Sequence, residues 1–175
     1  MTKKEKYTEY FKPTVVLTLI CLIVTAALAV TYGITKPIIE ANSRAAAEAT
    51  RKAVLSTADT FTAYEGQLNE GILDVYVADN KSGVVITAQG KGFGGKLTVM
   101  VGLDAKGTVT GLQVTEHSET PGVGTKDMTE EHLALYQGHT AGDVDGVTGA
   151  TKSANGINQA VNRAIEQFQA LGGAF

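Results

Sequence analysis

The sequence has little of what metal-binding and iron–sulfur proteins need. Its 175 residues include one cysteine and three histidines. One cysteine excludes an internal disulfide framework, a cysteine-rich zinc site and a self-contained iron–sulfur cluster ligated by cysteines. The histidines are scattered without a metal-ligand spacing (His117, His132 and His139). We therefore expect no metal site.

An excess of basic charge is also missing. Fifteen Lys and Arg residues stand against 18 Asp and Glu residues, which gives a net charge of −3. This charge gives no reason to expect a basic surface that would bind nucleic acid. The length suffices for one membrane segment and one domain of ordinary size.

One long uncharged stretch stands near the N-terminus. Residues 1–13 are basic, and residues 14–32 then lack charge and are rich in Leu, Ile, Val and Ala. As a helix, that stretch would cover roughly 28 Å, close to the hydrocarbon thickness of a bilayer. The lysines before it predict a cytoplasmic N-terminus and a protein bulk outside the cytoplasm. Small residues at 26–29 leave a cleaved signal peptide open as the alternative.

Residues 33–60 are predicted to connect this span to a domain. Gly33 to Pro37 marks the exit from the membrane, with Lys36 at the interface. The following residues, 38–58, are rich in Ala and Glu and indicate an exposed, weakly amphipathic helix.

Residues 61–175 are predicted to form the domain, of the α+β class. Apolar residues alternate with polar ones in four stretches, which predicts strands at 72–78, 84–88, 97–103 and 109–115. Turn sequences at 79–83 and 104–107 predict two hairpins. One face of the third strand should be core, and a short helix at 128–136 should turn Leu133 and Tyr136 inward. Together, these elements predict an antiparallel sheet covered by helices.

The glycine-rich stretch 90–97 imitates two nucleotide-binding motifs. It satisfies G-x-G-x-x-G and nearly satisfies the P-loop pattern, with Leu97 where Ser or Thr is needed. Both motifs require a helix after the glycines, so that its N-terminus meets the phosphates. A strand follows here instead, so we interpret the stretch as a hairpin loop whose glycines allow close backbone approach.

Asp145 to Ser153 joins a polar loop to a strongly periodic helix. Ser153 is the candidate N-cap. Thr151 would then offer its hydroxyl near the helix N-terminus, where unpaired N–H groups and the helix dipole favour a phosphate. Gly149 and Ala150 leave room for a large planar group. An ordinary capped loop is the alternative interpretation.

A second loop, His117 to Gly124, follows the fourth predicted strand. Pro121-Gly122 fixes a turn in it. The residues by themselves predict no more than a tight loop, because Ser118 beside His117 cannot form a nucleophile–base pair on an extended chain.

The motif Asp-x-x-Thr-Gly-Ala-Thr at residues 145–151 resembles the flavinylation motif of the FMN-binding domain family. With Gly-Phe-Gly-Gly-Lys at 92–96 and the stretch 117–124, nearly the whole chain is similar to G subunits of Rnf electron-transport complexes. Phe93 replaces the usual Tyr, and Thr148 a common Ser; neither change removes the hydroxyl of the attachment position.

This resemblance implies a set of residues around a flavin. Thr151 would carry FMN as a covalent phosphoester, attached from FAD by a flavin transferase. The residues implied around it are Asp145, Thr148, Gly149, Ala150, Lys152 and Ser153. The other loop would lie by the flavin through His117, Glu119, Thr120, Pro121 and Gly122.

The resemblance also implies a function and partners. The chain would be an electron-carrier subunit, without catalytic residues of its own, in a complex that couples ferredoxin oxidation and NAD reduction to ion transport. Its partners would be other membrane and redox subunits, the flavin transferase and the lipid bilayer. Alternatives are the C subunit of a sodium-pumping quinone reductase, a free-standing flavin carrier outside the cytoplasm, and a non-redox membrane-tethered assembly or binding protein.

Overall fold

The computed structural model describes residues 11–172 of the chain. The chain divides into two compact units, one ending at Ala46 and the other beginning at Ala47. Most of the predicted cytoplasmic tail, residues 1–10, lies outside the described residues, and so do residues 173–175.

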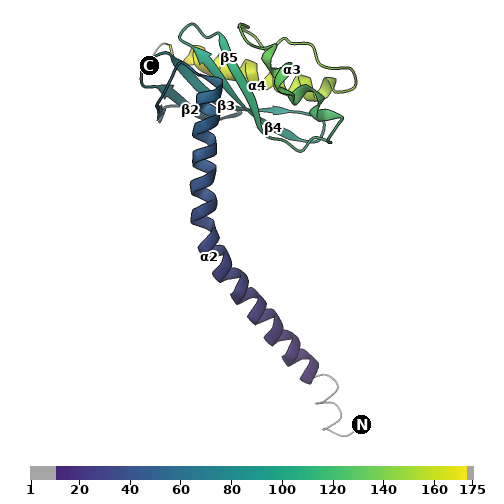
Figure 1. Ribbon diagram of the computed structural model, residues 1–175. Coiled ribbons are helices and arrows are strands. Elements are labelled where there is room, and N and C mark those ends of the chain that lie inside the picture. Colours follow the sequence, from purple (N-terminus) through teal and green to yellow (C-terminus); the bar gives the residue numbers. More distant parts are fainter. Residues whose placement is uncertain (1–10, 173–175) are drawn as a thin grey trace. The chain divides into compact units, whose positions relative to one another are not determined.

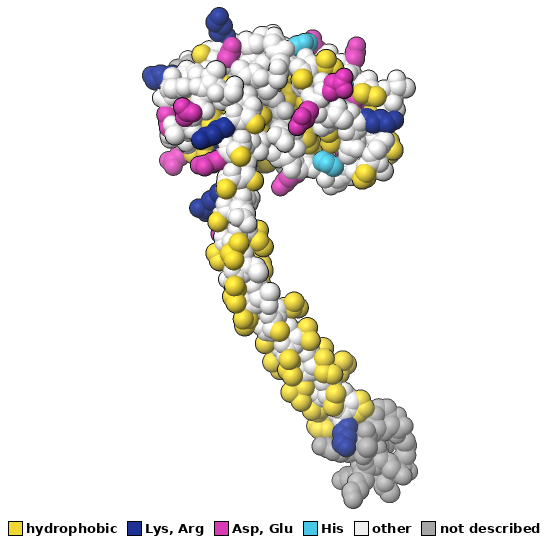
Figure 2. Space-filling view, in the orientation of Figure 1, with side chains coloured by type: hydrophobic (Ala, Val, Ile, Leu, Met, Phe, Trp, Pro, Cys, Tyr) yellow, Lys and Arg dark blue, Asp and Glu magenta, His cyan; other side chains and the backbone are white. Residues whose placement is uncertain are grey.

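One helix, α2 (Lys12–Val54), provides the described structure of the first unit. Figure 1 colours it from purple to blue. It is long and apolar enough to cross a membrane, judged by its length and composition. Its large apolar side chains are exposed, as Leu17, Ile23 and Leu28 show with exposed fractions of 64–66%, and yellow side chains cover this stretch in Figure 2. A helix that is apolar all round suits lipid better than water.

Helix α2 continues through Gly33 and Pro37, the residues expected to mark the membrane exit. Proline lacks the N–H of a regular helix, so helical structure here persists despite a missing hydrogen bond. Two residues before Pro37, the Thr35 hydroxyl donates to the carbonyl oxygen of Thr31 at 3.0 Å. The helix ends at Val54, four residues before the predicted end at Ala58.

The second unit is built on a five-stranded antiparallel sheet in the order β1-β2-β3-β4-β5. Its strands are β1 (Phe61–Ala63), β2 (Ile72–Ala78), β3 (Gly83–Lys91), β4 (Lys96–Asp104) and β5 (Val109–Glu116). Each strand pairs with the next along the chain, and Lys91 opposite Lys96 closes the glycine-rich loop as a hairpin. The predicted α+β class and the four longer strands are confirmed. Strand β1 was missed because three residues are too few to show alternation.

Helix α4 (Thr151–Ala170) packs on one face of the sheet, as Figure 1 shows in yellow. Its buried residues include Ile157, Val161 and Ala164, which share a core with the predicted inward face of β4. Close approach is possible because Gly90 of β3 lies against the backbone of Gly156, where a Cβ atom would collide.

The opposite face of the sheet is covered as well. Val54 and Leu55, together with Ala58, pack on Val85 and Met100. Strands β3 and β4 are consequently buried on both faces, whereas the alternation of β4 predicted a core on one face alone. Two short helices complete the unit, η2 (Gly124–Met128) and α3 (Glu130–Ala134), and both residues predicted to turn inward, Leu133 and Tyr136, are buried.

Candidate functional site

The last threonine of the 145–151 motif is the first residue of α4. The residues before it form a turn in which the Ala150 N–H donates to the carbonyl oxygen of Val147 at 2.9 Å. Gly149 has φ +91°, a conformation that glycine adopts without strain. Thr151 and Lys152 are exposed. The turn therefore delivers the Thr151 hydroxyl to the surface at the start of a helix.

The predicted capping role of Ser153 is wrong. Helix α4 begins at Thr151, with Ala150 at the N-cap position three residues before Ser153, and no side chain of the described residues caps it. Ser153 is instead buried in the first helical turn, and its hydroxyl donates to Oε2 of Glu119 at 2.9 Å. Because a helix can begin without a side-chain cap, the capping preference of Ser153 misplaced the start of α4.

Glu119 connects three segments of the chain. It stands in the 117–124 loop, is only 5% exposed, and accepts from Ser153 of α4. Its other carboxylate oxygen, Oε1, accepts from the Gly94 N–H in the β3–β4 hairpin at 3.0 Å. A buried carboxylate needs such partners. Glu119 thus ties the hairpin, its own loop and the start of α4 together.

Glycines make room for this carboxylate. A Cβ atom at Gly92 or at Gly124 would collide with the Glu119 carboxylate, and one at Gly94 with the carbonyl oxygen of Ser118. The prediction that the hairpin glycines allow close approach is confirmed at Gly92 and Gly94. Their purpose is packing against the 117–124 loop.

These three segments enclose a cavity of about 310 Å³. Five of its lining residues come from the motif and its continuation into α4, and the others come from the hairpin and the 117–124 loop. They are Phe93, Glu119, Thr120, Val123, Gly124, Gly149, Ala150, Thr151, Lys152 and Ser153. The structure therefore brings together seven of the residues predicted around a flavin.

Gly124 was missed as a cavity residue, and so were the apolar residues Phe93 and Val123. Both are exposed, at 69% and 51%. The Lys152 Nζ atom lies 5.3 Å from the centre of the Phe93 ring, within range of a cation–π contact. The sequence feature that could have indicated Phe93 is its position as an aromatic residue at the tip of a glycine-rich hairpin.

Five predicted residues do not line this cavity. His117 lines a separate cavity of about 390 Å³ beside β5 and α3. Its Nδ1 atom accepts from the N–H of Glu119 at 3.3 Å, so it contacts the site through the loop backbone. The other four are exposed at the two turns that precede cavity residues: Pro121, Gly122, Asp145 and Thr148.

The residues present fit a planar group that carries a phosphate. Phe93, Val123 and Ala150 give the cavity apolar walls, and Gly149 adds no side chain. The start of α4, which also lines the cavity, has backbone N–H groups without a side-chain cap and a lysine as its second residue. Such a helix terminus favours an anion. A larger cavity of about 470 Å³ is instead lined by charged and amide side chains, including Glu70, Lys91, Lys96 and Arg163.

Comparison with known proteins identifies the two parts of the chain. Residues 92–166, which include the hairpin, the 117–124 loop and most of α4, match the FMN-binding domain family. Residues 1–54 match the RnfG N-terminal region. The chain is thus an FMN-binding domain protein with an apolar N-terminal helix.

Similar curated proteins narrow the family further. The chain is 27% identical to the G subunit of the proton-translocating ferredoxin:NAD(+) oxidoreductase complex of Clostridium ljungdahlii, over 99% of both chains. It is 26% identical to the G subunit of the Na(+)-translocating ferredoxin:NAD(+) oxidoreductase complex of Acetobacterium woodii, over 92% of both. The G subunit of an ion-translocating oxidoreductase complex of Escherichia coli is 35% identical over 60% of this chain and 61% of its own length. The chain is therefore similar to Rnf complex G subunits over nearly its whole length, and its N-terminal part matches the RnfG N-terminal region.

Proposed function

We propose that this chain is the membrane-anchored flavin carrier of an Rnf-type ferredoxin:NAD oxidoreductase complex, with FMN held as a phosphoester on Thr151. The observation that carries the proposal is the exposed Thr151 hydroxyl at the uncapped start of α4, on the wall of a cavity with an exposed aromatic residue. The family match to an FMN-binding domain and the names of the related G subunits support it. These names favour the Rnf complex over a quinone reductase, a free-standing carrier or a non-redox tether.

Attachment would be a transfer from FAD catalysed by a separate flavin transferase. The Thr151 oxygen forms a bond to the phosphorus of the FMN half, and the phosphoanhydride bond to AMP breaks. AMP leaves and the hydroxyl proton is released, so no oxidant or reductant is needed. The new phosphodiester is negative, and the N-terminus of α4 can stabilise it by about 0.3–1 kcal/mol. Lys152 adds a positive charge next to it.

Bound FMN supplies the redox chemistry, and the chain's own residues hold and tune it. Phe93, Thr120, Val123, Gly149 and Ala150 are proposed to surround the ring. Glu119 and Ser153 would keep the walls in place.

The remaining predicted residues would act outside the cavity. Asp145 and Thr148 belong to the motif that the transferase reads. His117, Pro121 and Gly122 would support the loop that carries Glu119.

The proposal extends to the arrangement in the membrane. Residues 1–13 would be a cytoplasmic tail, 14–32 the transmembrane span, 33–60 the connecting helix and 61–175 the domain outside the cytoplasm. The lipid bilayer and the other membrane and redox subunits of the complex would be its partners.

The test replaces the two motif threonines one at a time. Thr151→Ala removes the only oxygen that its side chain offers, so covalent flavin should vanish. Thr148→Ala is the matched control, since Thr148 is an exposed threonine three residues away in the same motif, and this variant should still carry flavin. Peptide mass spectrometry after expression with a flavin transferase should find the mass of FMN less one water on Thr151. Flavin on Thr148, or an unmodified peptide despite active transferase and FAD, would contradict the proposal.

A further inference from the structure

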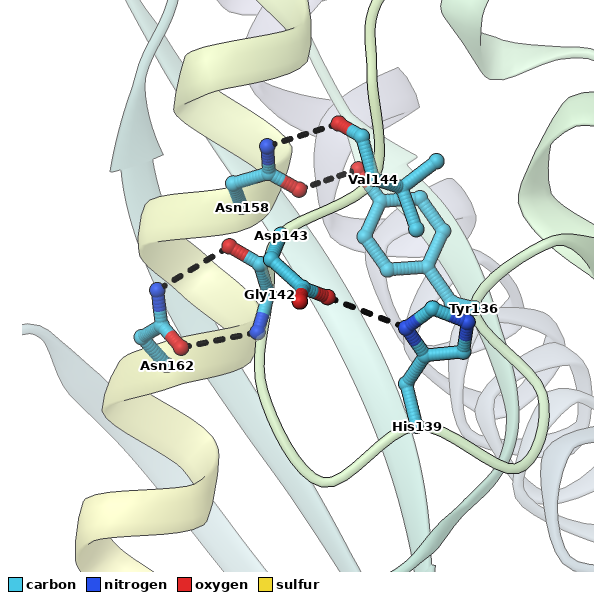
Figure 3. Close-up of polar contacts among 7 residues, drawn as sticks. All are labelled: Tyr136, His139, Gly142, Asp143, Val144, Asn158 and Asn162. Atoms are coloured by element: carbon cyan, nitrogen blue, oxygen red, sulfur yellow. Dashed lines mark hydrogen bonds and ion pairs between the residues drawn. The ribbon is translucent and has the colours of Figure 1, made fainter.

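Thr151 is preceded by the turn Val147–Ala150, which we call the acceptor turn. The segment that leads into this turn, residues 142–147, runs along α4 in the opposite direction; we call it the strap. Asn162 of α4 holds its beginning, because Gly142 N–H donates to Oδ1 of Asn162 at 2.8 Å and Nδ2 of Asn162 donates to the Gly142 carbonyl at 3.2 Å. One helical turn earlier, Nδ2 of Asn158 donates to the carbonyl oxygen of Val144 at 2.9 Å. Figure 3 shows both asparagines pointing from α4 to the strap.

The end of the strap is anchored by a buried acid. Oδ1 of Asp127, in η2, accepts from the Val147 N–H at 2.6 Å, and Asp127 is fully buried. The Nε2 atom of His132 lies 3.5 Å from the same oxygen. Val147 is also the residue whose carbonyl oxygen begins the acceptor turn. The anchor therefore acts on the turn that leads directly to Thr151.

Two glycines let the strap lie close to the helix. A Cβ atom at Gly142 would collide with the carbonyl oxygen of Asn158, and one at Gly146 with the Cβ atom of Ala154. These contacts are four residues apart on the strap and four apart on α4, so the two backbones stay close along this whole length. The strap is fitted to the helix and is not a loose connection.

We propose that Asn158 and Asp127 are positioning residues for the flavin: through the strap they fix the turn Val147–Ala150, whose last two residues line the cavity. This inference rests on the proposed attachment of FMN to Thr151. Attachment needs the motif residues 145–151. Asn158 and Asp127 lie outside this motif. The strap instead determines how closely the cavity walls pack against the flavin attached to Thr151. Loosening it should leave the flavin attached but less shielded.

The test exploits the two different hydrogen bonds of Asn158. Its Nδ2 atom donates to the strap, while its Oδ1 atom accepts from the Tyr136 hydroxyl at 2.6 Å. Asn158→Asp removes the donor and sets a carboxylate against the Val144 carbonyl, but keeps the acceptor for Tyr136. Tyr136→Phe is the matched control, since it removes the other bond and leaves the strap bond in place. Asn155→Asp makes the same charge change at an exposed position of α4.

Three measurements on the full-length chain in detergent separate positioning from simple destabilisation. With flavin attached, Asn158→Asp should increase quenching of flavin fluorescence by acrylamide and shift the reduction potential. Without flavin, the Gly142 and Val147 amides should exchange with solvent faster by about tenfold or more, although their own acceptors are intact. Both controls should match the unsubstituted chain in all three respects.

The possible outcomes distinguish the positioning inference from the proposed function. Attached flavin with unchanged quenching and potential in Asn158→Asp overturns the inference and leaves the proposed function standing. Loss of attachment in Asn158→Asp also overturns it, because the strap would then serve the transfer itself. Absence of flavin from the unsubstituted chain removes the proposed function and the inference together.

A second variant covers the case in which Asn158→Asp does not fold. Gly142→Ala pushes the strap away from α4 through a single methyl group and leaves every strap-binding side chain in place. It should give the same increase in quenching with the flavin still attached. Quenching equal to that of the unsubstituted chain would overturn the inference.

Discussion

The carboxylate of Glu119 and the hydroxyl of Ser153 form a buried hydrogen bond of 2.9 Å between a loop and the first turn of α4. The partners are 34 residues apart in sequence, and both residues are buried. Their contact joins two of the segments that line the cavity. Since Gly94 donates to the same carboxylate, loss of Glu119 would release the hairpin as well.

Glu119→Ala should destabilise the domain and open the cavity. The substitution leaves the buried Ser153 hydroxyl without its partner and removes the acceptor of the N–H of Gly94, an exposed residue, at a cost of about 1.5–3 kcal/mol in the free energy of unfolding. Glu119→Gln should cost less, because an amide can accept from Gly94 and donate to Ser153. Chemical denaturation of the full-length chain in detergent measures both.

Ser153→Ala tests the same contact from the other side. A double-mutant cycle with Glu119→Ala should show coupling of about 0.5–3 kcal/mol, as expected for residues in direct contact. Additive effects of the two substitutions would mean that the bond contributes nothing to stability.

Phe93→Ala should change the flavin and spare the fold. Phe93 is 69% exposed, so its removal should alter the free energy of unfolding by less than about 0.5 kcal/mol. It also removes the aromatic wall of the cavity and the ring beside Lys152. We expect greater solvent access to the flavin, measured by acrylamide quenching. Leu135→Ala is the control, because Leu135 is an exposed apolar residue (54%) in the α3 region; equal quenching in both variants would show that Phe93 does not cover the ring.

The orientation in the membrane can be tested by protease accessibility. The lysines before the uncharged span predict that the N-terminus is cytoplasmic and that the domain lies outside. Protease added to cells with a permeable outer layer should digest the domain and spare the N-terminal tail. A C-terminal fusion reporter that is active only in the cytoplasm should be silent. Reporter activity would reverse the predicted orientation.

Periodicity was sufficient to predict most of the fold. Strands β2 to β5 alternate apolar and polar residues or form apolar runs between clear turn sequences, and α4 repeats apolar residues at helical spacing. These patterns depend on neighbours in sequence. The start of α4 was misplaced because the capping preference of Ser153 is a weak local signal beside a tertiary bond to Glu119.

The site could be predicted only where a motif marks it. Thr151 and its neighbours were indicated by the motif, and Glu119 by the family resemblance of the stretch 117–124. Asp127 and Asn158 gave no signal, since a lone acid in a short helix and an asparagine on a helix surface are common. Their roles arise from contacts 14 to 20 residues away in sequence, which only the folded chain creates.

Tyr136 should make the stability of the domain fall at alkaline pH. Its side chain is fully buried and donates to Asn158 at 2.6 Å. Burial, together with the negative charges of Asp127 and Asp143, raises the pKa of its hydroxyl above the ordinary value of 10.0. The unfolded chain therefore loses this proton at lower pH than the folded one. Above about pH 10 the folded state binds more protons, so raising the pH favours unfolding.

The size of this loss of stability is set by the single proton of the Tyr136 hydroxyl. Between the pKa of the unfolded chain and the higher pKa of the folded one, the free energy of unfolding should fall by roughly 1.4 kcal/mol per pH unit from Tyr136 alone. Tyr136→Phe has no such proton, so its stability should decline less steeply above pH 10, although it starts lower because Asn158 loses a partner. Denaturation of both chains at pH 8 and pH 11 measures the difference. Parallel curves for the two chains would mean that the Tyr136 hydroxyl titrates as freely when folded as when unfolded.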